Sequence, residues 1–110
     1  MNIAIAFKNM KGQYEIEKFS LFEIEKVNTK FPSHEVKINK SKEMIIKVGC
    51  PLCGEQHYYK YNLCELIKRE MTIGGCEILG LPVFYIGSKE KIEQRVNKYR
   101  EINRQLFDII

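Results

Sequence analysis

The stretch that decides the fold reads MIIKVGCPLCGEQHYYKY and covers residues 44–61. Its first and last five residues are rich in β-branched and aromatic side chains, which favour strands. Between these ends lies a short loop, Cys50–Gln56, that holds two cysteines. The pattern predicts two neighbouring strands joined by this segment, which we call the cysteine loop.

The flanking sequence alternates between strand and helix patterns. Runs of alternating or β-branched apolar residues predict further strands, at residues 1–7, 14–19, 35–38 and 83–86. Apolar residues at helical spacing predict three helices. The first covers residues 21–30, the second begins at Asn62 and includes Met71, and the third runs from Ser88 to the C-terminal residues. Gly74-Gly75 marks the end of the second helical region. This order predicts a single α+β domain, residues 1–110, with a small mixed or antiparallel sheet and a long C-terminal helix.

Length and composition exclude several classes of protein. The 110 residues are 45% hydrophobic and 29% charged, which is typical of a globular domain and excludes a disordered tail or a fibre. No apolar run approaches the roughly 20 residues of a membrane span, so no membrane partner is expected. The first residues carry no basic segment ahead of an apolar stretch, which argues against a secretory signal and for the cytoplasm. The Ile- and Lys-rich, Ala-poor usage suits an AT-rich bacterial or phage genome.

The net charge says little about a partner. The chain has 18 Lys and Arg against 14 Asp and Glu, which gives a formal charge of +4 and a pI near 8.9. The signs alternate along the chain, as in Lys89-Glu90-Lys91, and such mixing is typical of a solvated helix face. The excess therefore permits an acidic partner without requiring one.

The chain contains four cysteines, Cys50, Cys53, Cys64 and Cys76. Because nothing indicates secretion, a disulfide framework is not expected. Two thiols separated by two residues, as at Cys50 and Cys53, indicate metal binding or redox chemistry in a reducing compartment.

The cysteine loop begins with Cys50-Pro51-Leu52-Cys53-Gly54, which resembles the knuckle of zinc-ribbon and rubredoxin-like proteins, Cys-Pro-x-Cys-Gly. The resemblance covers about ten residues, Val48–His57, and implies a zinc knuckle at about 48–57. Two thiolates at this spacing can each contact one zinc ion at about 2.3 Å. Pro51 stiffens the turn, and Gly54 can adopt the positive φ that lets the chain turn back.

The remaining zinc ligands are less clearly marked. A ribbon would repeat the Cys-x-x-Cys pair roughly 12–20 residues later, but Ile67 and Leu79 stand three residues after Cys64 and Cys76. Structural zinc is bound by four ligands, so the simplest prediction is that Cys64 and Cys76 complete the site with the two cysteines of the loop. His57 is an alternative ligand, and an ordinary core position is the alternative for each single cysteine.

A redox function is the alternative interpretation of the cysteine pair. Cys-Pro-x-Cys also resembles the active site of glutaredoxins, and Leu81–Gly87 resembles the segment that packs against that site. Cys50 would then be the nucleophile and Cys53 the resolving thiol. Only 28 residues separate Cys53 from Pro82, which is short for the required helix, strand and second helix. Gly54 also stands where that helix should begin.

The strand after the cysteine loop is unusually aromatic. Tyr58, Tyr59 and Tyr61, with Lys60 among them and Lys47 on the facing strand, could form a stacking surface for single-stranded nucleic acid. The alternative is a half-buried sheet with one aromatic face in the core.

The chain carries no familiar catalytic motif. It has no phosphate-binding loop, no Gly-x-Ser-x-Gly elbow and no histidine-glutamate metalloprotease motif, so no catalytic residue is expected, and His34 is given no role. We predict a small non-catalytic zinc-binding protein that acts as a regulatory or adaptor module for a protein or nucleic-acid partner. The apolar stripe from Ile92 to Ile109 on the C-terminal helix would permit a homodimer.

Overall fold

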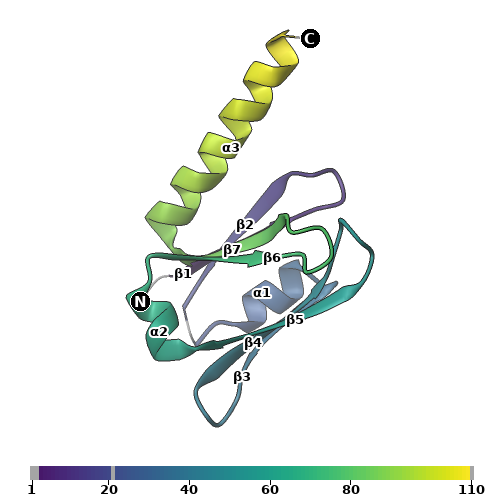
Figure 1. The fold of residues 1–110 in the computed structure, drawn as a ribbon. Coiled ribbons are helices and arrows are strands. Elements are labelled where there is room, and N and C mark those ends of the chain that lie inside the picture. Colours follow the sequence, from purple (N-terminus) through teal and green to yellow (C-terminus); the bar gives the residue numbers. More distant parts are fainter. Residues whose placement is uncertain (1–2, 21, 110) are drawn as a thin grey trace.

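The computed structural model describes residues 3–20 and 22–109, with the helical backbone alone for 103–109. Figure 1 shows two sheets facing each other, with one short helix between them in this view, a second short helix at one end and a long helix that rises from one sheet. In chain order the elements are β1 (Ile3–Lys8), β2 (Tyr14–Phe19), α1 (Glu25–Lys30), β3 (His34–Ile38), β4 (Glu43–Gly49), β5 (Gln56–Asn62), α2 (Leu63–Lys68), β6 (Met71–Gly75), β7 (Pro82–Ser88) and α3 (Lys89–Ile109).

The strands form two antiparallel sheets. Sheet A has four strands in the order β2-β1-β7-β6, and sheet B has three in the order β3-β4-β5. Every pair of neighbouring strands is antiparallel. The α+β class predicted from the sequence is confirmed, with two small sheets in place of one.

The main core lies between the sheets. Along β4 the buried and half-buried residues alternate, so that Met44, Ile46 and Val48 point toward sheet A. They share one hydrophobic cluster with Phe7 and Phe84 of sheet A. Burying each of these side chains contributes about 1.5–3 kcal/mol. The alternation therefore leaves the other face of sheet B open to solvent.

Sheet A is covered on its second face by α3. Ala4 and Ala6 of β1 are fully buried there, and their small side chains let Ile92 and Val96 of α3 pack closely. Farther along α3, the Tyr99 hydroxyl donates a hydrogen bond to the Gly12 carbonyl oxygen at 2.8 Å. The helix then continues past the sheets (Figure 1). Among the described residues, no helix combines the length and the apolar character that crossing a membrane requires.

The observed elements differ from the predicted ones mainly at β6. Met71 was expected on a helix and Gly74-Gly75 at its end, but the helix stops at Lys68 and both glycines belong to the strand. Gly74 is needed there because the ring of Phe84 on β7 occupies the space that a Cβ would take. Glycine is depleted in strands, so Gly74 and Gly75 weaken the strand signal of Thr72 and Ile73, which is why the sequence pattern missed β6.

Three predicted elements, the strand at 1–7, the helix at 21–30 and the C-terminal helix, extend outside the described residues. Helix α1 begins at Glu25 instead of residue 21. The Ser20 hydroxyl donates a hydrogen bond to the Glu23 carboxylate at 3.0 Å, and both residues lie before the helix. Residues 1–2 and 21 lie outside the described residues, as do the side chains of Leu106 and Ile109 in the predicted stripe.

Candidate metal centre

Four side chains meet where the two sheets come together beside the cysteine loop. The sulfur atoms of Cys50, Cys53 and Cys76 and a ring nitrogen of His57 all lie within 4.8 Å of one another. A tetrahedral site with zinc–sulfur bonds of about 2.3 Å separates its sulfur ligands by about 3.8 Å. Only a small closure is needed for this group, which we call the Cys3His cluster, to hold a metal ion.

Three of the four side chains come from sheet B. Cys50 directly follows β4, and the cysteine loop closes on itself through hydrogen bonds from the Cys50 N–H to the Glu55 carbonyl oxygen (2.8 Å) and from the Gly54 N–H to the Cys50 carbonyl oxygen (3.0 Å). Gly54 has a φ of 79°, a value that favours glycine. His57 on β5 points inward, and its Nε2 atom lies 3.2 Å from the Cys53 sulfur.

The fourth side chain comes from sheet A. Cys76 directly follows β6 and begins a tight turn, in which its carbonyl oxygen accepts a hydrogen bond from the Gly80 N–H at 2.7 Å. The Leu79 N–H points at the Cys76 sulfur, at 3.4 Å. Such N–H donors stabilise a thiolate. The cluster therefore joins the cysteine loop of sheet B to the β6–β7 turn of sheet A.

The surroundings favour the charged form of one thiol. Burial raises the pKa of Cys76, but hydrogen bonds from the backbone of Leu79 and Ile78 and from the side chains of Cys53 and His57 outweigh it and lower the pKa to about 6. A backbone hydrogen bond from Glu55 lowers the pKa of Cys53, yet burial and the neighbouring thiols leave that pKa raised. A thiolate at Cys76 beside the protonated thiol of Cys53 is a suitable starting state for metal binding, which displaces the thiol proton.

Three of the four predicted ligands meet in this cluster, and the fourth position is taken by His57. Cys64 lies exposed in the first turn of α2, outside the cluster, where its N–H is bound by the Asn62 side chain at 2.9 Å. His57 shares the inward face of β5 with Tyr59 and Tyr61. Residues 57, 59 and 61 follow the period of two that places side chains on one face of a strand. This shared face with two aromatic residues was the signal that could have ranked His57 above Cys64 as a ligand.

Tyr59 adds a second link between the sheets. Its hydroxyl donates a hydrogen bond to the Gly75 carbonyl oxygen at 2.5 Å, one residue before Cys76. Its ring packs edge-on against Phe84, with the ring centroids 4.9 Å apart. Burial raises the pKa of the Tyr59 hydroxyl to about 12, so it stays protonated and remains a donor.

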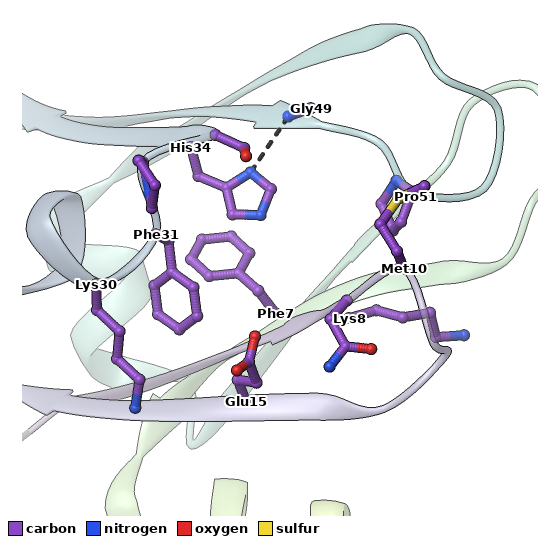
Figure 2. Close-up of a pocket in the computed structure, with 12 residues that line it drawn as sticks. Phe7, Lys8, Met10, Glu15, Lys30, Phe31, His34, Gly49 and Pro51 are labelled. Carbon is purple, nitrogen blue, oxygen red and sulfur yellow. Dashed lines mark hydrogen bonds between the residues drawn. The ribbon is translucent and has the colours of Figure 1, made fainter.

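His34, which sequence reasoning left without a role, supports the start of the cysteine loop. Its Nδ1 atom accepts a hydrogen bond from the Gly49 N–H at 3.2 Å, and its ring stacks on Phe7 with a centroid separation of 4.3 Å. Burial lowers the pKa of His34, which keeps the ring neutral and Nδ1 free to accept. Figure 2 shows this imidazole above Phe7, in the wall of a pocket of about 190 Å³ that Pro51 of the loop also lines.

The chain after the second cysteine of the loop is extended. Gly54 turns the chain and β5 begins at Gln56, so residues 54–62 contain no helix. A glutaredoxin-like site requires a helix at this point, because the helix N-terminus lowers the pKa of the attacking thiol.

Comparisons with protein-family models, with curated proteins and with solved structures found no match to this chain. The likeness to zinc ribbons is thus carried by the Cys-Pro-x-Cys-Gly run of the cysteine loop. The chain departs from a ribbon in the other half of the site, where single residues of β5 and of the β6–β7 turn replace a second Cys-x-x-Cys pair.

Proposed function

We propose that this protein is a small, non-catalytic zinc-binding module in which zinc in the Cys3His cluster fastens sheet A to sheet B. The observation that carries the proposal is the convergence of three sulfur atoms and one imidazole nitrogen, within 4.8 Å, from two different sheets. Thiolate and imidazole are the ligands that zinc prefers. The fastened sheets then serve as a regulatory or adaptor platform for a partner.

A structural role suits the cluster better than a catalytic one. Structural zinc sites use four protein ligands, whereas catalytic sites keep one position for water or substrate. This cluster supplies four ligands, and Cys50, Cys76 and His57 are each less than 7% exposed. A metal held by all four side chains would have no open position for a substrate.

Elemental analysis of the purified protein tests the proposal, with one zinc per chain expected. Cys76→Ser and His57→Ala should both lose zinc affinity in a chelator competition, and Cys76→Ser should lose more because a thiolate completes a sulfur-rich site better than an imidazole. Cys64→Ser is the matched control and should keep full zinc, because Cys64 lies outside the cluster. A wild-type protein without tightly bound zinc, or a Cys64→Ser variant that loses it, would overturn the assignment.

A further inference from the structure

The outward face of sheet B is open to solvent. The side chains on this face, which we call the outer face, are exposed or half-buried, whereas their neighbours along each strand point into the core. They are Glu35 and Lys37 of β3, Glu43, Ile45 and Lys47 of β4, and Gln56, Tyr58, Lys60 and Asn62 of β5.

The strand register places an aromatic ring among lysines on this face. Tyr58 lies directly opposite Lys47, and Lys60 lies directly opposite Ile45. Side chains paired in this way have Cβ atoms about 4.5–5.5 Å apart. Tyr58 is 63% exposed, which is unusual for a large aromatic side chain and leaves one side of the ring free to stack. Tyr59 and Tyr61, by contrast, face the core.

Positive charge outweighs negative charge on this side of the molecule. Lys37 pairs with Glu35 at 4.0 Å, and Lys60 pairs with Glu43 at 3.8 Å, and these long, exposed pairs are easily exchanged for another anion. Lys47 forms no ion pair among the described residues. The β3–β4 turn adds two further exposed lysines at the end of the sheet. The five lysines are Lys37, Lys40, Lys42, Lys47 and Lys60.

We propose that the outer face binds single-stranded nucleic acid, with a base stacked on Tyr58 and phosphates held by Lys47 and Lys60. Single-strand binding needs an aromatic platform beside basic groups that follow the backbone, and this face supplies both. A duplex hides its base faces inside the stack, so Tyr58 can stack only on an unpaired base. The inference rests on the proposed role as a binding module and names its partner, but it does not depend on zinc.

The test is fluorescence anisotropy of the zinc-loaded protein with a labelled single strand of about 16 nucleotides, long enough for one site. Tyr58→Ala should weaken binding about 5- to 150-fold, the loss expected for one stacked base, and Tyr58→Phe should bind like the wild type. Lys47→Ala should reduce the slope of log affinity against log salt by about 0.7, the value for one phosphate contact on a single strand. Lys98→Ala, on an exposed turn of α3, is the matched control and should leave the affinity unchanged.

The inference is wrong if the wild type fails to bind the single strand, if Tyr58→Ala binds as tightly as Tyr58→Phe, or if a duplex of the same sequence binds as well. Zinc content measured on the same samples separates this result from the metal proposal. If the protein contains zinc but does not bind the single strand, only the proposal of a nucleic-acid partner is wrong. If the protein contains no zinc but binds the single strand, only the proposal of a metal centre is wrong.

Discussion

Tyr59 makes a polar contact between the two sheets. Its hydroxyl donates to the Gly75 carbonyl oxygen, and its ring is held against Phe84. Tyr59→Phe should keep the ring contact and lose the hydrogen bond, which lowers the free energy of unfolding by about 1 kcal/mol. Chemical denaturation measures the loss, and zinc content should stay at the wild-type level. An unchanged free energy of unfolding would show that the hydrogen bond does not stabilise the contact between the sheets.

The His34 ring makes stability depend on pH. Burial lowers its pKa, so below the unfolded value of about 6.5 the unfolded chain binds more protons than the folded one, and stability falls as the pH falls. His34→Asn can still accept from the Gly49 N–H through its side-chain oxygen but does not titrate. The wild type should therefore lose more free energy of unfolding than His34→Asn between about pH 7.5 and about pH 5.5.

Chemical denaturation of both proteins at both pH values is the measurement. Protonation of the Cys3His cluster affects the two proteins alike, so the difference between them reports His34. Equal losses of stability in both would contradict a buried, neutral imidazole.

At the scale of elements, the packing of β6 on β7 depends on the first of two adjacent glycines. A Cβ at Gly74 would overlap the ring of Phe84, whereas a Cβ at Gly75 would meet only the Leu81 carbonyl oxygen at 3.6 Å, an ordinary contact. Gly74→Ala should destabilise the protein by about 1–3 kcal/mol, the usual cost of overpacking. Gly75→Ala is the matched control and should change the melting temperature much less. Similar melting temperatures for the two variants would mean that the Phe84 ring moves aside freely.

The strand β5 bears directly on the redox alternative. Because β5 follows the cysteine loop, Cys50 has no helix N-terminus to make it a reactive thiolate. We therefore expect no turnover of a small mixed disulfide, with or without a chelator. Turnover by metal-free protein that disappears in Cys50→Ser would make Cys50 a nucleophile and reverse this interpretation.

At the scale of the whole molecule, zinc would add stability to a fold that already has two hydrophobic cores. One hydrophobic cluster lies between the sheets and a second lies under α3. Removing zinc from a site loaded at about 1,000 times its Kd should cost about 4 kcal/mol of stability. The melting temperature should fall while the far-UV circular dichroism is retained at room temperature.

Hydrogen exchange would locate the change caused by the chelator. Protection should be lost around the two turns that hold the cluster, residues 48–57 and 76–81, and kept in β1 and β7, which lie in the buried centre of sheet A. Cooperative unfolding of the whole chain on chelation would show instead that the two cores cannot hold the sheets together.

Local patterns were sufficient for most of the secondary structure. A run of β-branched residues marked β4, a polar cap at Asn62 marked the start of α2, and Cys-Pro-x-Cys-Gly marked a turn able to hold two thiolates. Each of these signals depends on residues a few positions apart, so each can be interpreted without knowing the fold. The strand β6 escaped this logic because Gly74 is explained only by Phe84 on the next strand.

The sequence by itself determined that Cys50 and Cys53 lie in one turn between two strands, but it could not say what completes the site. Cys64 and Cys76 look alike in sequence, as single cysteines near apolar residues. Only the stacking of sheet A on sheet B brings Cys76 to the cysteine loop and leaves Cys64 exposed on α2. That choice depends on the many apolar contacts that hold the two sheets together. No short stretch of the chain encodes it, because these contacts join residues far apart in sequence.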